Sequence, residues 1–279
     1  MRVIVAESAG FCRGVRRAVD KASELASEHA RVYTDGPLIH NEQMLDRLRA
    51  RGIVETHDAA ALGRDVLLVR AHGIPPERRA ELRRLAATLV DCTCPDVARI
   101  QGLVRRDARR GHSVVVFGDE GHAEVTGLLG FAEGRGHLVT GPADVAALPG
   151  LERPCVVSQS TQRPSAYAAV AAALLERFPD ATVHDTICES TRRRQEDLLR
   201  LAGECDALVV VGGEHSANTR RLVELARTLA PAFHVQTAAQ IRARDFAGFG
   251  CVGLTAGAST PGFILEDVRK ALSRIPADG

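Results

Sequence analysis

Three cysteines, each following an apolar run that is typical of a β-strand, share one spacing. A polar residue that could bind a ligand lies 28 positions after each of Cys12, Cys94 and Cys188, at His40, His122 and Ser216 respectively. This spacing indicates a threefold internal repeat. Three thiolates can hold a 4Fe-4S cluster by three irons and leave the fourth iron open to a substrate. The trio therefore predicts a redox enzyme.

A second polar position follows each cysteine by 60 to 71 residues, and it is occupied by His72, Ser160 and Ser259. Asn218 lies close to Ser216. We expect all these residues at turns that lead into helices, where backbone amides favour an anion. Compact donors of this kind suit a phosphate or diphosphate. The sequence contains no P-loop and no Asp-rich magnesium motif, so the side chains must neutralise the charge.

Glu124, two residues after His122, is the best candidate for a general acid. The hydroxyl of Ser160 could relay its proton. The alternative is a first-turn acid that only stabilises its helix.

The remaining cysteines are expected to be packing residues, because cysteine is among the most frequently buried residue types. Cys155, Cys205 and Cys251 fit that expectation. Cys92 is an alternative ligand, since Cys92-Thr93-Cys94 would place both thiols on one strand face, but only Cys94 keeps the spacing. Zinc is the competing metal, although structural zinc usually takes four ligands in closely spaced pairs.

The elements that must position these residues follow from the alternation of short apolar runs with amphipathic segments. This pattern predicts an α/β fold with mainly parallel sheets. A helix is expected after each of the three cysteines. We place three lobes of similar size at residues 1–93, 94–187 and 188–279. Strands are expected to begin at Val3, Arg31, Val66, Leu89, Ser113, Cys155, Ala207 and Cys251.

Composition excludes several classes of function. A formal net charge of +1 over 279 residues gives no reason to expect a nucleic-acid partner. No apolar run approaches the roughly 18 residues that a membrane span needs. Seven cysteines without a CxxC motif argue against a disulfide framework and favour the cytoplasm.

Motifs along nearly the whole chain resemble those of the 4-hydroxy-3-methylbut-2-enyl diphosphate reductase family, the last enzyme of the non-mevalonate isoprenoid pathway. They are Gly10-Phe11-Cys12-Arg13-Gly14-Val15, Leu38-Ile39-His40-Asn41, Ala71-His72-Gly73, Asp91-Cys92-Thr93-Cys94-Pro95, Gly121-His122-Ala123-Glu124-Val125, Ser158-Gln159, Thr186-Ile187-Cys188, Ser216-Ala217-Asn218 and Thr255-Ala256-Gly257-Ala258-Ser259.

The resemblance implies a trefoil of three α/β lobes around one 4Fe-4S cluster held by Cys12, Cys94 and Cys188. It implies an oxidoreductase that removes the hydroxyl of the allylic diphosphate and yields isopentenyl and dimethylallyl diphosphate. Glu124 would donate the proton. The diphosphate would be bound by His40, His72, His122, Ser216, Asn218 and Ser259, with electrons coming from a ferredoxin or flavodoxin.

Three departures from the family pattern leave room for a paralogue. One is Glu189-Ser190-Thr191 after the third cysteine, and the other two lie among the expected pocket residues. Ser160-Thr161 stands where the family usually has Thr-Thr, and Ala217 replaces a serine of Ser-Ser-Asn. A paralogue that reduces a different allylic diphosphate is therefore one alternative. A quinolinate synthase-like enzyme and a non-enzymatic phospho-ligand binding protein are two others.

Two runs of arginines follow cluster cysteines and suggest a basic rim that docks the electron donor. They are Arg13, Arg16 and Arg17, and Arg192, Arg193 and Arg194. The alternative is a solvated helix face.

Overall fold

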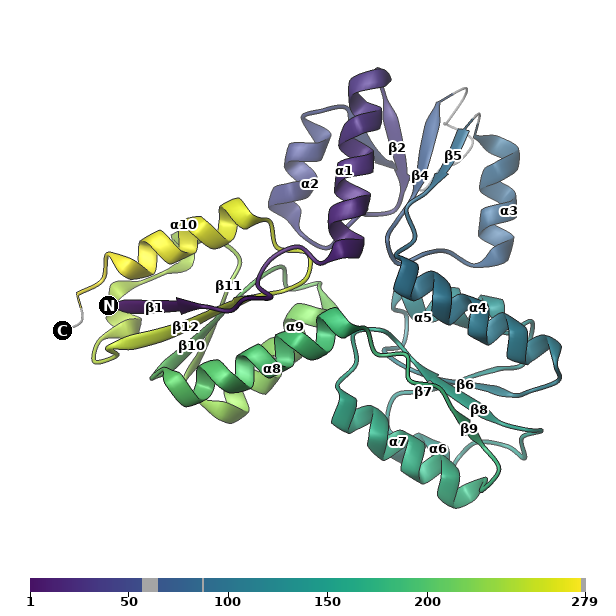
Figure 1. The fold of residues 1–279 in the computed structure, drawn as a ribbon. Helices are drawn as coiled ribbons and strands as arrows, with labels where there is room; N and C mark the ends of the chain where they lie inside the picture. The colour runs from purple at the N-terminus through teal and green to yellow at the C-terminus, as the bar shows by residue number, and fades with distance from the viewer. Residues whose placement is uncertain (57–64, 87, 277–279) are drawn as a thin grey trace. The chain divides into compact units, whose positions relative to one another are not determined.

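The computed structural model describes residues 1–56, 65–86 and 88–276. The chain divides into two compact units, and within each of them parallel four-stranded sheets carry helices on their faces (Figure 1). The first unit comprises Met1–Arg16, Ile39–Arg47 and Glu189–Gly279. The second comprises Arg17–Leu38 and Leu48–Cys188.

The first unit contains one sheet with the strand order β1-β12-β10-β11. Its strands are β1 (Arg2–Val5), β10 (Ala207–Val211), β11 (Ala232–Val235) and β12 (Cys251–Ala256). Its helices are α8 (Glu189–Glu204), α9 (Ala217–Leu229) and α10 (Gly262–Ser273), with the short 3-10 helices η2 (Ala238–Gln240) and η3 (Ala243–Phe246). In Figure 1, α10 covers one face of the sheet, and α8 and α9 cover the other.

Burial of both faces explains why β10 is an unbroken apolar run. Val209 packs in one apolar cluster with Val268 of α10. Val210 points to the opposite face, where it packs in a second cluster with Leu198 of α8. A strand with two buried faces has no polar alternation, as is usual in parallel sheets.

The second unit contains two sheets, with the strand orders β3-β2-β4-β5 and β7-β6-β8-β9. The strands of the former are β2 (Val32–Asp35), β3 (Ile53–Thr56), β4 (Val66–Val69) and β5 (Thr88–Asp91). Those of the latter are β6 (Val114–Phe117), β7 (Gly136–Val139), β8 (Cys155–Ser158) and β9 (Thr182–Val183).

The helices of the second unit are α1 (Arg13–Glu28), which belongs to it from Arg17 on, α3 (Pro76–Leu85), α4 (Pro95–Arg109), α5 (Ala123–Phe131), α6 (Pro142–Val145) and α7 (Pro164–Arg177). Helix α2 (Glu42–Arg49) belongs to the first unit up to Arg47. Alternating residues of β6 again serve two cores. Val116 packs with Val104 of α4, and Val115 packs with Val170 of α7.

The predicted α/β class is confirmed, and so are the eight predicted strands, each of which begins within one residue of its predicted start. The helices after Cys12, Cys94 and Cys188 are α1, α4 and α8. The predicted lobe of residues 1–93 does not correspond to a single sheet. Its first strand, β1, pairs with β12 and so belongs to the sheet of the last third of the chain.

Within the described residues, no helix is both long enough and apolar enough to cross a membrane.

Candidate functional site

The spacing of 28 residues in the sequence corresponds to a repeated position in the structure. His40, His122 and Ser216 each lie five residues after the end of a central strand, namely β2, β6 and β10. His122 is the N-cap of α5 and Ser216 is the N-cap of α9. Each of these three residues therefore lies just before a helix, as predicted.

The second set of loops follows the other three central strands, and here the structure changes one assignment. His72, Thr161 and Ser259 each lie three residues after the last residue of β4, β8 and β12. Thr161 therefore occupies the position equivalent to His72 and Ser259, whereas Ser160 is equivalent to Ala71 and Ala258. The sequence does not distinguish Thr161 from Ser160, because two adjacent hydroxyl residues fit the variable spacing equally well.

The three cysteines are each anchored to one of these second loops by a backbone hydrogen bond. The amide of each cysteine donates to the carbonyl of the residue at the Ser160-equivalent position. The bonds join Cys12 to Ala258 (3.0 Å), Cys94 to Ala71 (2.9 Å) and Cys188 to Ser160 (3.0 Å). The repeat thus includes a shared contact as well as a shared spacing.

Exposure separates the three proposed cluster ligands from Cys92 and Cys155, but Cys205 and Cys251, which were expected to be packing residues, are also partly exposed. Cys12, Cys94 and Cys188 are partly exposed free cysteines, each directly preceding a helix. Cys92 and Cys155 are buried, and burial raises the pKa of Cys92 to about 11 and that of Cys155 to about 12. Because iron binds the thiolate, the first three fit a cluster and the two buried thiols do not.

Local contacts support this division. The amide of Val15, in the first turn of α1, donates to Sγ of Cys12 at 3.4 Å, so the positive end of the helix faces the sulfur. The expectation that Cys92 and Cys94 share a strand face is wrong, because β5 ends at Asp91 and Cys94 is the N-cap of α4.

The loop before Cys12 is held by charged side chains of α8. A carboxylate oxygen of Asp197 accepts hydrogen bonds from the amide of Ser8 (2.8 Å) and from its hydroxyl (2.6 Å). Arg194, 2% exposed, donates to the carbonyl of Gly10. Arg194 is therefore a buried structural residue, and its predicted place on an exposed basic rim is wrong.

A polar turn precedes Cys94. Asp91 accepts hydrogen bonds from the amide of Thr93 (2.9 Å) and from its hydroxyl (2.5 Å), and it forms an ion pair with Arg79. Burial alone would raise the pKa of Asp91, but these contacts outweigh it and hold the pKa below its ordinary value. Arg17 of α1 donates to the carbonyl of Thr93 (3.1 Å).

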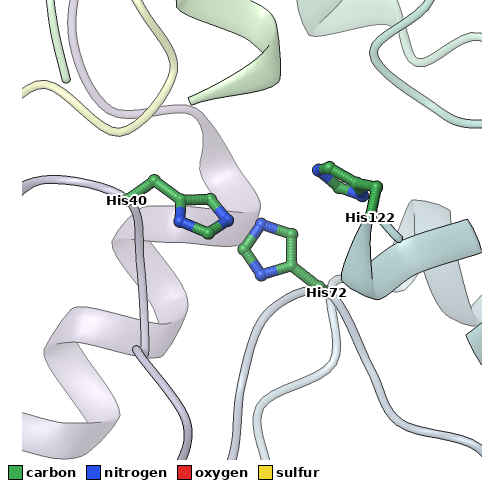
Figure 2. Close-up of side chains that lie close together, drawn as sticks. All are labelled: His40, His72 and His122. Atoms are coloured by element: carbon green, nitrogen blue, oxygen red, sulfur yellow. The ribbon is translucent and has the colours of Figure 1, made fainter. Parts of the chain in front are cut away.

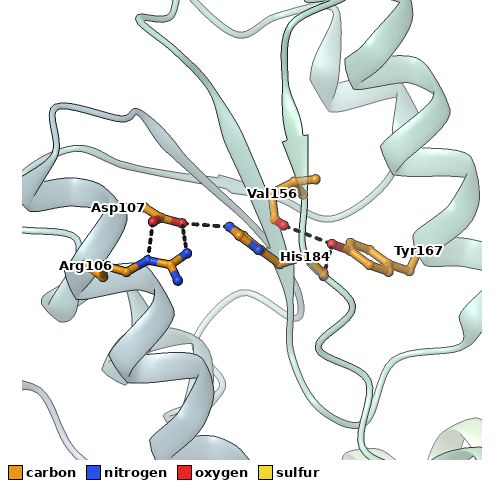
Figure 3. A network of polar contacts seen from close by, with 5 residues as sticks. All are labelled: Arg106, Asp107, Val156, Tyr167 and His184. Atoms are coloured by element: carbon orange, nitrogen blue, oxygen red, sulfur yellow. Dashed lines mark hydrogen bonds and ion pairs between the residues drawn. The ribbon is translucent and has the colours of Figure 1, made fainter.

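The segment that leads to Cys188 starts from a polar network centred on Asp107 (Figure 3). Arg106 donates to both carboxylate oxygens of Asp107, and Nε2 of His184 lies 2.6 Å from one of them. The hydroxyl of Tyr167 donates to the carbonyls of His184 (2.7 Å) and Val156 (3.0 Å). Side chain and backbone of His184 are therefore both fixed.

The pKa of Asp107 reflects this network. Burial would raise it, but the hydrogen bonds from Arg106 and His184 prevail and hold it below its ordinary value. The sulfur of Cys155 also lies within 4.8 Å of the Asp107 and His184 ligand atoms. This group could hold a metal ion, but the guanidinium on Asp107 opposes a further cation there.

Nearer to Cys188, a buried pair of hydroxyl residues continues the anchoring. The hydroxyl of Thr186 accepts from the amide of Ser158 (2.7 Å) and donates to the carbonyl of the same residue (3.0 Å). Both side chains are fully buried.

The carboxylate oxygens of Glu124 lie within 3 Å of the amide and hydroxyl of Ser160, the predicted proton relay. The Glu124 carboxylate is 1% exposed, and its two oxygens accept hydrogen bonds from the amide (2.7 Å) and the hydroxyl (2.9 Å) of Ser160. The carbonyl of Ser160 accepts from the amide of Cys188. Within the second unit, Ser160 therefore joins the candidate acid directly to a candidate cluster ligand.

Two of the predicted histidines contact each other edge to face. The ring centroids of His72 and His122 are 5.6 Å apart (Figure 2). Nδ1 of His122 accepts the amide of Glu124 at 3.2 Å, so a neutral His122 carries its proton on Nε2. The structure thus brings together the predicted His72, His122, Glu124 and Ser160.

One glycine is required beside His72. Gly73 has a φ of +71°, and a Cβ built there would lie 2.3 Å from Nε2 of Gln101. Substitution at Gly73 would therefore strain the backbone next to His72 and force the Gln101 side chain to move.

The first unit contains the remaining predicted residues. The hydroxyl of Ser216 accepts the amide of Thr219 (3.3 Å) and so caps α9. The hydroxyl of Ser259 donates to the carbonyl of His40 (3.1 Å). Asn218 is 5% exposed, and its Nδ2 has no hydrogen-bond partner among the residues described. Because an unpaired buried donor is costly, this amide at a helix N-terminus is suited to an anionic ligand.

Comparisons with known sequences agree with this geometry. The family profile described as "LytB protein" matches residues 3–273. A protein of Opitutus terrae named 4-hydroxy-3-methylbut-2-enyl diphosphate reductase is 45% identical over 282 residues, covering 96% of this chain and 98% of the relative. A protein of the same name from Aquifex aeolicus is 37% identical, covering 98% of this chain and 96% of the relative.

Two solved structures have related folds. The E-1-hydroxy-2-methyl-but-2-enyl-4-diphosphate reductase of Plasmodium falciparum matches with a TM-score of 0.94 and 26% identity, covering 99% of this chain and 89% of that one. An (E)-4-hydroxy-3-methyl-but-2-enyl diphosphate reductase, described as the terminal enzyme of the non-mevalonate pathway, matches with a TM-score of 0.74 and 36% identity. That match covers 99% of this chain and 100% of the other.

Proposed function

The chain belongs to the LytB protein family, and we propose that it reduces 4-hydroxy-3-methylbut-2-enyl diphosphate to isopentenyl and dimethylallyl diphosphate. The relatives named above support the substrate. The observation that carries the proposal is the continuous contact from Glu124 through Ser160 to Cys188, which joins a buried acid to a candidate cluster ligand.

The allylic hydroxyl leaves as water in a step that consumes two electrons and two protons. One 4Fe-4S cluster held by Cys12, Cys94 and Cys188 would supply the electrons and a Lewis-acidic iron. In this proposal Glu124 supplies a proton, and the Ser160 hydroxyl passes it from the buried carboxyl toward the substrate. Because water is the leaving group, this proton is needed where the C–O bond breaks.

The diphosphate would be bound by donors from several strand-to-helix turns. They are His40, His72, His122, Ser216, Asn218 and Ser259, to which the equivalent position of Thr161 adds a seventh. Imidazole, amide and hydroxyl groups, together with the helix N-termini at His122 and Ser216, are suited to an anion without a metal ion.

We retain the three repeats of 1–93, 94–187 and 188–279 as a proposal about internal duplication, and the shared cysteine contacts support it.

A cluster bound by free thiolates needs a reducing compartment, which favours the cytoplasm.

A second candidate substrate rests on Ala217, the buried first residue of α9. An alanine there offers no hydroxyl beside Ser216 and Asn218. The site would then hold the diphosphate with one contact fewer, and a different allylic diphosphate is the second candidate substrate.

The electron donor would be a ferredoxin or flavodoxin that docks on exposed arginines after Cys12. Arg13 and Arg16 are exposed on the first turn of α1, whereas Arg194 is buried. Charge reversal by Arg13→Glu with Arg16→Glu should slow turnover with an acidic protein donor and leave turnover with a small chemical reductant unchanged. Arg244→Glu, on η3, is the matched control. Equal loss with both reductants would reject the docking site.

The proposed activity is tested by anaerobic turnover of 4-hydroxy-3-methylbut-2-enyl diphosphate with a reduced donor. Brown protein with about four irons per chain should yield both isomeric products. Inactivity of protein with a full cluster would reject this substrate, and the same preparation would then be assayed with other allylic diphosphates. Colourless, iron-free protein that still binds diphosphate would instead favour a non-enzymatic binding protein.

A further inference from the structure

Two cysteines of the first unit, outside the proposed cluster set, lie in direct contact. Cys205 follows the end of α8, and Cys251 is the first residue of β12. Their sulfurs are 3.2 Å apart, so a disulfide of about 2.05 Å requires an approach of roughly 1.2 Å. Neither residue has the 28-residue spacing that distinguishes the cluster cysteines.

The backbones that carry these thiols are held together by three hydrogen bonds through one residue. The amide of Asp206 donates to the carbonyl of Cys251 at 3.0 Å. In return, a carboxylate oxygen of Asp206 accepts the amides of Gly250 (2.9 Å) and Cys251 (2.8 Å). The two sulfurs therefore meet because the main chain places them together, which reduces the ordering needed for bond formation.

The exposure of the pair differs from that of the packing cysteines. Cys205 and Cys251 are both partly exposed, whereas Cys92 and Cys155 are 2% and 1% exposed. A small oxidant can reach the former pair. Burial, together with the neighbouring thiol of Cys251, raises the pKa of Cys205 to about 12. Because its thiolate is not stabilised, reduction of a disulfide at this place gains little from thiolate formation.

We propose that Cys205 and Cys251 are a thiol-oxidation site that forms a reversible intramolecular disulfide by exchange with a small-molecule disulfide such as oxidised glutathione. Because the raised pKa belongs to Cys205, Cys251 attacks the glutathione disulfide first, forms a mixed disulfide and releases one glutathione. The second cysteine attacks the mixed disulfide and releases the other. Two protein thiols and one glutathione disulfide thus give one protein disulfide and two glutathione thiols.

The bond would stabilise the first unit without altering the proposed site. It would join residues 46 positions apart and so connect the end of α8 to the start of β12. The site residues lie at the opposite ends of these elements, since Cys188 precedes α8 and Ser259 follows β12. Oxidation is therefore expected to leave turnover unchanged while it raises thermal stability.

The test uses the anaerobically purified holoprotein, incubated with oxidised glutathione, alkylated with N-ethylmaleimide and digested for mass spectrometry. A cross-linked peptide containing Cys205 and Cys251, two hydrogens lighter than its reduced parts, is the expected product. The melting temperature should rise by about 5 °C or more and return to its initial value after dithiothreitol.

Two variants serve as controls. Cys155→Ser should form the same cross-link, whereas Cys251→Ser should form none and show no melting shift. Recovery of both cysteines as separate alkylated or glutathione-modified peptides from the wild type would overturn the proposal, whatever the stability of the variants.

Discussion

The site loops around Glu124 and those around Asn218 differ in how far their polar groups are satisfied. Both oxygens of Glu124 accept hydrogen bonds from Ser160, and Ser160 in turn accepts the amide of Cys188. Asn218 is nearly as buried, yet its Nδ2 has no partner among the residues that the structure describes.

This difference separates two roles. A group that transfers a proton benefits from a fixed position, because reorganisation during the reaction raises the barrier. A group that binds an anion must keep a donor available, and it tolerates the resulting cost only if the ligand later removes it. We infer that Glu124 is held by the fold, whereas the Asn218 amide finds its partner in the substrate.

The largest expected effect is on iron binding by the proposed 4Fe-4S cluster. Cys188→Ser should abolish iron binding, because serine replaces a thiolate ligand. Cys155→Ser, at a buried thiol of the same unit, should retain the iron. Iron content and the visible absorption of anaerobic protein measure both. Equal iron in the two variants would contradict the ligand assignment.

The next largest effect is expected when Glu124 loses the hydroxyl of Ser160. Ser160→Ala removes one of the two hydrogen bonds to Glu124 and should lower kcat about 10- to 100-fold, the value of a hydrogen bond to a charged group. Ser160→Thr keeps the hydroxyl and should retain most of the activity. If both variants lose activity equally, the hydroxyl is not a proton relay.

A smaller effect is expected on the binding side. Ala217→Ser adds a hydroxyl next to Ser216 and should tighten substrate binding by up to about 10-fold, with kcat unchanged. Titration of the purified protein with the substrate measures the dissociation constant. Weaker binding would show that the position excludes a polar group and would favour the alternative substrate.

The last effect is on stability and not on the reaction. Asp107 has a pKa held below its ordinary value, so its contribution is fully present above the unfolded pKa of about 4 and disappears as the pH falls through the lower folded pKa. Asp107→Asn should therefore lower the free energy of unfolding by about 2 kcal/mol at pH 7 and by less below pH 4. Urea unfolding at several pH values measures this difference. If the difference in unfolding free energy between the wild type and Asp107→Asn stays constant with pH, the Asp107 carboxylate is not its cause.

Sequence patterns identified all the central strands and two edge strands, β1 and β5, but missed the other four edge strands. All six central strands are among the eight predicted. Two buried faces produce continuous apolar runs in strands such as β4, β6 and β10, although β2 ends in Thr34 and Asp35. The four strands that were missed, β3, β7, β9 and β11, all lie at sheet edges and have partly exposed residues. Their short, mixed patterns cannot be distinguished from loops.

The candidate site was predictable where residue type and spacing coincide. Cysteines and histidines are rare enough for a repeated offset to be informative. Thr161 was missed because Ser160 is also a hydroxyl residue, and only the end of β8 distinguishes them. Arg194 was misplaced because a buried arginine on a carbonyl cannot be told from an exposed one by its neighbours in sequence.

The division of roles is tested most directly by comparing Glu124→Gln with Asn218→Ala in one anaerobic assay that measures both kcat and the substrate dissociation constant. Glu124→Gln should lower kcat about 100-fold or more and leave the dissociation constant within a few-fold of wild type. Asn218→Ala should raise the dissociation constant about 10- to 100-fold with little change in kcat. If both variants change the same constant, the two regions do not have separate roles.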